Sequence, residues 1–80
     1  MTIEPVQLAR DSILEIQYHN FPKSLTTTCL IITSKRCEFI GYTHCASKDK
    51  FSLVIGQALA FENAFNKLVE FEVLKMKEKS

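Results

Sequence analysis

Three cysteines and two histidines carry the most reactive side chains in this 80-residue sequence. Cys29, Cys37 and Cys45 follow one another at intervals of eight residues, and His19 and His44 join them as candidate metal ligands. No pair of them has the short Cys-x-x-Cys or His-x-x-x-His spacing of a structural zinc site, although Cys29 and Cys45 could approach each other across a hairpin. We therefore expect no metal centre and no other cofactor.

Catalysis by cysteine needs a thiolate beside a base. His44 directly precedes Cys45, but neighbouring residues on a strand point to opposite faces of a sheet. The sequence also contains no glycine-rich phosphate loop, no paired-carboxylate motif and no G-x-S-x-G turn. We expect a protein that is not an enzyme.

Composition narrows the class of partner. Ten Lys and Arg stand against nine Asp and Glu, so the chain lacks the basic surface of a duplex-binding module. There is no charged-then-apolar leader and no apolar run approaching the length of a membrane span, which argues against secretion and against a membrane partner. An odd number of cysteines fits reduced thiols in a cytoplasm. The length predicts one domain over residues 1–80.

The hydrophobic pattern changes from period two to period 3.6 near residues 47–50. Before this point, strands are expected at 13–21, 25–33 and 37–45, with the last two forming an antiparallel hairpin. After it, one helix is expected from about residue 51 to 76. The fold class is therefore α+β, with an antiparallel β-hairpin or three-stranded sheet packed on one long C-terminal helix.

Capping residues suggest where the helices begin. Thr2 as an N-cap with Pro5 in the first turn is typical of a short N-terminal helix, which we include as an optional element. Ser47 or Asp49 would cap the long helix. Gly56 interrupts that helix without ending it, and close packing against another backbone is a reasonable cause.

Apolar residues occupy two faces of the long helix. The first stripe contains Val54, Ala58, Phe61, Phe65 and Leu68, and a roughly opposite one contains Gly56, Ala60, Asn63, Ala64, Lys67 and Phe71. The hairpin is also apolar on both faces, with Ile40 and Tyr42 on the face opposite Cys29. One helix can cover only one face, and the other would be a large exposed patch. We therefore predict a homo-oligomer with Phe61, Phe65, Ile40 and Tyr42 at the interface.

Asn63 lies among small residues on the second helix face, with Lys67 one turn later. A buried amide must find partners for its donors and acceptors. It could bond to a backbone carbonyl of the sheet or to a neighbouring subunit. Alternatively, it could read the polar edge of a planar ligand while Lys67 or Arg36 contacts a phosphate.

The run from Leu25 to Leu68 resembles a small early-region protein family of tailed bacteriophages, the N4/Sf6-type family. That family has a cysteine-containing strand, a hairpin, a second strand ending in cysteine, then Phe, Ile-Gly and a helix with Ala-x-x-Asn-Ala-x-x-Lys-Leu. The residues that match are Cys29, Gly41, Cys45, Phe51, Ile55, Gly56, Ala60, Asn63, Ala64, Lys67 and Leu68.

Some positions depart from the family pattern. Lys35 and Arg36 replace the usual Asn-Gly of the hairpin, so a residue with a side chain takes a left-handed position at a steric cost. Thr43 and His44 replace Ser-Ala before the second cysteine. Val69 stands where the family usually has Trp, and "FEVLKMK" replaces its Leu-Glu-Gly-Tyr stretch.

The resemblance extends to phage proteins that counter the Thoeris immune system. Those proteins are oligomeric sponges that sequester cyclic ADP-ribose signals or cyclic oligonucleotides without hydrolysing them. By analogy, Phe51 or an aromatic residue near it would stack on the base, Asn63 would meet the base or ribose edge, and Lys67 or Arg36 would meet phosphate. The resemblance places the protein in the host cytoplasm. Its alternatives are a protein that inhibits a host defence protein and a structural accessory protein.

Overall fold

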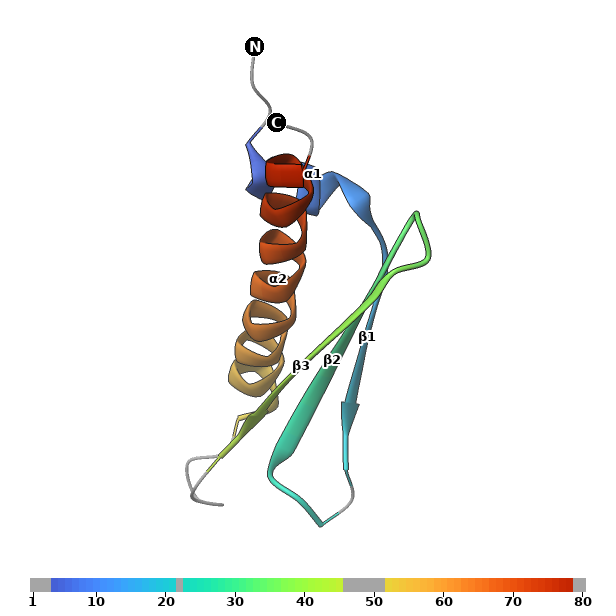
Figure 1. Ribbon diagram of the computed structural model, residues 1–80. Coiled ribbons are helices and arrows are strands. Elements are labelled where there is room, and N and C mark those ends of the chain that lie inside the picture. Colours follow the sequence, from blue (N-terminus) through green and yellow to red (C-terminus); the bar gives the residue numbers. More distant parts are fainter. Residues whose placement is uncertain (1–3, 22, 46–51, 79–80) are drawn as a thin grey trace.

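The computed structural model describes residues 4–21, 23–45 and 52–78. In these residues the elements follow the order α1 (Pro5–Ser12), β1 (Ile13–Asn20), β2 (Thr26–Thr33), β3 (Glu38–His44) and α2 (Leu53–Glu78). The strands form one antiparallel sheet in the order β1-β2-β3, and α2 lies along one face of it (Figure 1). The predicted α+β fold, with three strands, a long C-terminal helix and the optional N-terminal helix, is confirmed.

The helix starts differ in detail from the predicted ones. Glu4 is the N-cap residue of α1, and Pro5 occupies its first turn as expected, whereas Thr2 lies outside the described residues. Ser52 begins α2, because its hydroxyl oxygen accepts the Ile55 N–H at 3.4 Å and its carbonyl accepts the Gly56 N–H at 2.8 Å. The proposed caps at residues 47 and 49 lie outside the described residues.

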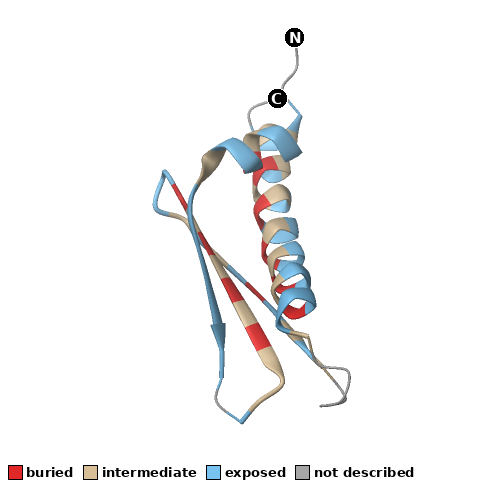
Figure 2. Ribbon diagram, turned by 180° about the vertical axis from the view of Figure 1, so that it is seen from behind, coloured by how far each residue is buried: buried red, intermediate tan, exposed pale blue. Residues whose placement is uncertain are grey.

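β2 forms the centre of the sheet because β-branched residues suit a strand that is covered on both edges. Its buried and half-buried residues alternate (Figure 2). The buried ones lie under α2, as the contact of Thr27 with Gly56 shows, and they are Thr27, Cys29, Ile31 and Thr33. The turn into β3 places Arg36 at φ 67°, the left-handed conformation predicted for this position. The Arg36 N–H donates to the Thr33 carbonyl at 2.9 Å and closes the turn.

The residues on the buried face of α2 are small near its N-terminus and larger toward its C-terminus. Gly56, Ala60 and Ala64 come first, and Leu68 and Glu72 follow at the same four-residue spacing. Our assignment of Leu68 to the opposite stripe was wrong. A row of i, i+4 residues drifts slowly around a helix, so Leu68 reaches the sheet even though it also borders Phe61 and Phe65.

Two glycines bring the helix and the sheet into direct contact. A methyl group on Gly41 of β3 would overlap the backbone of Ala60 and Ala64, so α2 lies against bare main chain at this point. A methyl group on Gly56 would stand 2.8 Å from the hydroxyl oxygen of Thr27. The small residues of "VIGQALAFENA" therefore serve close helix–sheet packing, as we expected for Gly56.

We expect Gly41→Ala to lower the free energy of unfolding by about 1–3 kcal/mol, because a rigid backbone cannot yield to the added methyl group. In a domain of this size that loss corresponds to a fall in melting temperature of about 4–8 °C per kcal/mol. Gly56→Ala is the matched control, since improved helix propensity offsets part of its contact with Thr27. Thermal unfolding followed by circular dichroism checks both variants, and an equal or larger loss at Gly56 would contradict the packing argument.

Candidate ligand site

A groove of about 490 Å³ runs between the free edge of β3 and one side of α2. Most of its lining residues carry polar side-chain groups, and they come from two segments that are about twenty residues apart in sequence. These residues are Gly41, Tyr42, Thr43, His44, Asn63, Asn66 and Lys67. The groove thus contains both residues on the helix that the sequence singled out for ligand recognition.

Asn63 and Lys67 both reach the backbone of β3. The Asn63 side-chain N–H donates to the Tyr42 carbonyl at 2.8 Å, and the Lys67 ammonium donates to the Ile40 carbonyl at 2.7 Å. Along an antiparallel strand, every second residue bonds to the neighbouring strand. Cys37 and Cys45, which flank β3, bond to β2 and to the residue that precedes it, so the odd-numbered residues of β3 face β2. The carbonyls of the even-numbered residues therefore point away from β2. The two side chains therefore bind the carbonyls that a neighbouring strand would otherwise use.

Of the two roles considered for Asn63, the structure shows the hydrogen bond to a backbone carbonyl of the sheet. Its role in ligand binding stays a prediction. The Lys67 ammonium has three N–H donors, so its bond to Ile40 leaves capacity for an anion. Asn66 lines the same groove and makes no hydrogen bond with the residues that the structure describes. Sequence reasoning missed Asn66, because only its position one turn from Asn63 and beside Lys67 could have indicated it.

His44 also lines the groove. Its Nδ1 lies 3.0 Å from the Thr26 hydroxyl, which holds the imidazole against β2. The described residues that line the groove include no carboxylate and no thiol. Tyr42 borders it as an aromatic residue with 63% of its surface exposed.

One of the other two predicted ligand residues lies away from this groove, and the second falls outside the described residues. Arg36 lies at the β2–β3 turn, whereas His44 lies at the other end of β3. Arg36 is not among the residues that line the groove. Phe51 lies outside the described residues. Of the described residues in the predicted ligand set, Asn63 and Lys67 line the groove.

The predicted interface residues divide into two groups. Ile40 and Tyr42 are 52% and 63% exposed on the sheet face away from α2. Phe61 and Phe65 stack at 5.5 Å between ring centroids and already pack on the core of a single chain. These two rings are therefore partly buried within one chain, and their place in a subunit interface stays a prediction.

The cysteines occupy separate environments. Cys29 is fully buried opposite Gly41, whereas Cys45 lies opposite Leu25 and donates its N–H to the Leu25 carbonyl at 3.0 Å. They are thus four residues apart in the ladder, which corrects the idea that they could meet across the hairpin. Burial raises the pKa of the Cys29 thiol, and burial together with Cys29 raises the pKa of the Tyr18 hydroxyl. No cluster of three or more His, Cys, Asp or Glu suited to a metal occurs among the described residues.

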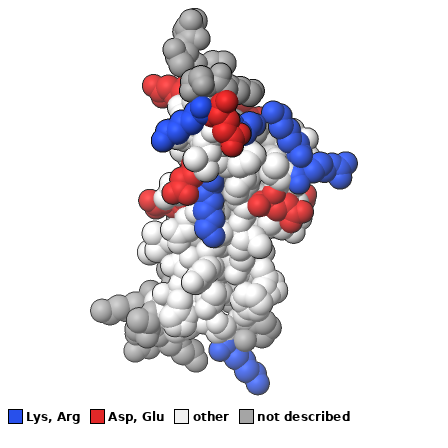
Figure 3. Space-filling model, in the orientation of Figure 1, with Lys and Arg blue, Asp and Glu red and all other residues white. Residues whose placement is uncertain are grey.

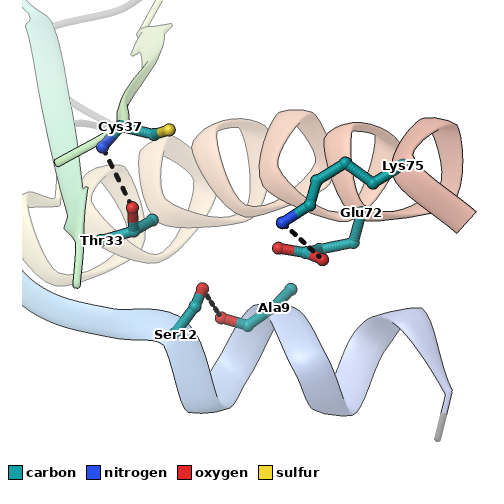
Figure 4. A network of polar contacts seen from close by, with 6 residues as sticks. All are labelled: Ala9, Ser12, Thr33, Cys37, Glu72 and Lys75. Atoms are coloured by element: carbon teal, nitrogen blue, oxygen red, sulfur yellow. Dashed lines mark hydrogen bonds and ion pairs between the residues drawn. The ribbon is translucent and has the colours of Figure 1, made fainter. Parts of the chain in front are cut away.

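A second cavity, of about 320 Å³, lies between α1, the β2–β3 turn and the C-terminal half of α2. It contains Glu72, which is 8% exposed and pairs with Lys75 at 3.7 Å (Figure 4). Nearby, the Ser12 hydroxyl donates to the Ala9 carbonyl at 2.8 Å and the Cys37 N–H donates to the Thr33 hydroxyl at 3.1 Å. Each of these three pairs is local to one helix or turn. The junction that holds α1 in place is formed by buried Ala9 and by the Ser34 N–H, which donates to the Ser12 carbonyl at 2.9 Å.

Charged residues lie mainly around that junction. In Figure 3 Lys, Arg, Asp and Glu gather toward the end of the molecule that carries α1, and the opposite half of this face is largely uncharged. No helix in the described part of the chain is long and apolar enough to cross a membrane. Lys67 is the cation among the described residues that line the groove, and no carboxylate is among them.

Comparison with protein families gives one match, which extends over residues 4–79. The matching family is described as the phage protein (N4 Gp49/phage Sf6 gene 66) family. The chain belongs to this phage protein family. The match includes both the sheet and α2, so the predicted resemblance to the N4/Sf6-type family is confirmed over nearly the whole chain. No curated protein and no solved structure matches it.

Because Asn63 bonds to a β3 carbonyl, we expect Asn63→Ala to lower the free energy of unfolding by about 0.5–1.5 kcal/mol, the net value of one hydrogen bond. Asn66→Ala is the matched control, since this amide has no such partner and its loss should leave stability unchanged. Urea unfolding of both variants measures the difference. Equal stability of the two would show that the Asn63 bond contributes nothing to the fold.

Cys29 should react with a thiol-alkylating reagent more slowly than Cys37 and Cys45 in the folded protein. Its burial blocks access and its raised pKa keeps the thiol protonated. Mass spectrometry after timed alkylation gives the three rates, and the difference should disappear in concentrated urea. Rapid modification of Cys29 in the folded state would contradict its place beneath α2.

Proposed function

We propose that this phage protein is an oligomeric anti-defence protein that captures a cyclic nucleotide signal and does not hydrolyse it. The signal would be of the cyclic ADP-ribose type or a cyclic oligonucleotide, and the protein would act in the host cytoplasm. The observation that carries this proposal is the convergence of Asn63, Asn66 and Lys67 on one groove beside β3. The resemblance to phage sponge proteins in the same helix and hairpin supports it.

The groove offers the groups that a nucleotide requires. Its volume of about 490 Å³ lies within the range of about 300–1,000 Å³ found for small-molecule sites. Lys67 would contact a phosphate through an ammonium N–H that Ile40 does not use. Asn66 would donate to and accept from the edge of a base or ribose, since a planar amide presents both kinds of group.

Capture without reaction fits the chemistry of the lining residues. Hydrolysis of a phosphodiester or glycosidic bond by side chains uses a positioned acid and base. Among the described residues that line the groove, the groups able to act in this way are His44, Tyr42 and Lys67, and the Lys67 ammonium already donates to the Ile40 carbonyl. The His44 imidazole already contacts Thr26. We therefore assign the groove to binding.

Inhibition of a host defence protein is the second candidate, and exposed apolar residues at the start of α2 favour it. Leu53, Val54 and Ile55 are 49%, 77% and 60% exposed, an unusual cluster on a helix end. In this alternative, the cluster would contact the host protein directly and no small ligand would be needed.

Incubation with a panel of cyclic nucleotides, removal of free ligand, heat release and mass spectrometry tests the proposal. We expect recovery of an intact cyclic nucleotide. Asn66→Ala should reduce capture at least about tenfold without changing the melting temperature, because each 1.4 kcal/mol of lost contact is a factor of ten. Lys67→Ala should also reduce capture and should remove the decrease in affinity with added salt.

Arg36→Ala is the matched control for Lys67→Ala, since it removes the same charge away from the groove. Its capture should equal that of the wild type. No captured nucleotide from the whole panel, together with a host protein that binds wild type and loses binding on Val54→Asp, would replace the sponge with the inhibitor.

A further inference from the structure

The two edge strands of the sheet differ in whether side chains bind their outward backbone groups. At the β3 edge, Asn63 and Lys67 bind outward carbonyls. At the β1 edge, every residue after Ile13 is exposed. β1 contains neither Lys nor Pro, which natural edge strands use to prevent pairing with another strand. An open edge of this kind is a surface for strand addition.

The backbone groups available on this edge follow from the register. The odd-numbered residues of β2 exchange hydrogen bonds with β3. The backbone groups of the even-numbered residues of β2 point the other way and bond to β1. Their partners in β1 are Glu15, Gln17 and His19. The N–H and C=O groups of Ile16 and Tyr18 therefore point away from the sheet, into solvent.

The same two residues form an uncovered apolar strip. Ile16 and Tyr18 lie opposite Ile31 and Cys29, which places their side chains on the α2 side of the sheet. They are nevertheless 39% and 42% exposed, because α2 packs mainly on β2 and β3. A partner at this edge would gain both hydrogen bonds and apolar contact.

We propose that the partner is a second copy of this chain, joined antiparallel through β1 to give one continuous six-stranded sheet. The two-fold axis passes beside Gln17. This inference deepens the self-association included in the proposed function, since it names the surface and the register through which two copies meet.

The side chains of β1 complement themselves about this axis. With Gln17 opposite Gln17 of the partner copy, Glu15 lies opposite His19, and an imidazole N–H can donate to the carboxylate. On the α2 side, Ile16 lies opposite Tyr18, and the two residues exchange backbone hydrogen bonds. The arrangement occurs twice by symmetry, so each strand supplies both partners.

Neighbouring registers that keep the hydrogen bonds pair the side chains less well. An axis at Ile16 would bring Tyr18 opposite Leu14, where the β1–β2 ladder has an irregularity between Ile13 and Glu15. An axis at Tyr18 would bring apolar Ile16 opposite polar Asn20. The register centred on Gln17 uses only the regular part of β1.

The second copy would also extend cover over the apolar strip. Phe61 and Phe65 lie on the side of α2 about 200° around the helix from Asn63, which contacts the β3 edge. They therefore face toward β1. In the six-stranded sheet, the rings of both copies would flank the central strip formed by the two pairs of Ile16 and Tyr18.

Disulfide trapping tests the register. Gln17 would form a pair without direct hydrogen bonds, with Cα atoms about 4.5 Å apart, and a disulfide spans about 4.4–6.8 Å. Mild oxidation should therefore convert Gln17→Cys to a covalent dimer. Glu15→Cys is the matched control on the same exposed face, because its two copies would be separated by about 13 Å along the strand. Oxidised wild type shows the background from the native cysteines.

A charge exchange tests the same contact without oxidation. Glu15→Lys should raise the dimer Kd about tenfold through its two symmetric contacts, and adding His19→Glu should restore it. Analytical ultracentrifugation gives both values, with circular dichroism confirming that each variant is folded. A Gln17→Cys variant that stays unlinked, or links no better than Glu15→Cys, would overturn the proposal. Trapping needs no nucleotide, so its outcome is independent of the capture experiment.

Discussion

The contact between bare backbone at Gly41 and the backbone of Ala60 and Ala64 determines how the rest of the molecule is arranged. With no side chain between them, α2 lies close enough to β3 for the short Asn63 side chain to reach a strand carbonyl. A larger residue at the contact would lift the helix by more than a hydrogen bond can follow. Packing and polar edge contact therefore depend on the same few small residues.

This contact also moves α2 to one side of the sheet. A single helix of 26 residues covers β2 and β3 and leaves the α2-facing side of β1 half exposed. A chain of 80 residues buries only about 60% of the surface of its unfolded form, so it has little apolar area to leave uncovered. The proposed association through β1 would pair the unbonded backbone groups of this edge strand and would cover its apolar side chains in the same contact.

The periodicity of the sequence was enough to predict three strands and the long helix, and the resemblance to the phage family indicated the left-handed residue of the hairpin turn. Periodicity could not determine which stripe of α2 faces the sheet, since both stripes contain apolar residues and Leu68 lies near their boundary. The partner of Asn63 was also beyond reach, because it is a backbone carbonyl and carries no side-chain signal. Asn66 and the open edge of β1 became visible only when the sheet order placed β3 beside α2 and β1 away from it.

The groove and the open edge lie at opposite ends of the strand order, and this separation has a consequence for function. Joining two chains through β1 leaves Asn66 and Lys67 of each copy accessible at the outer edges of the six-stranded sheet. Each chain then contributes one complete groove, so binding capacity grows with the number of chains. A protein that acts by sequestration must match its target in number, and small subunits with one site each meet that demand with little protein mass per site.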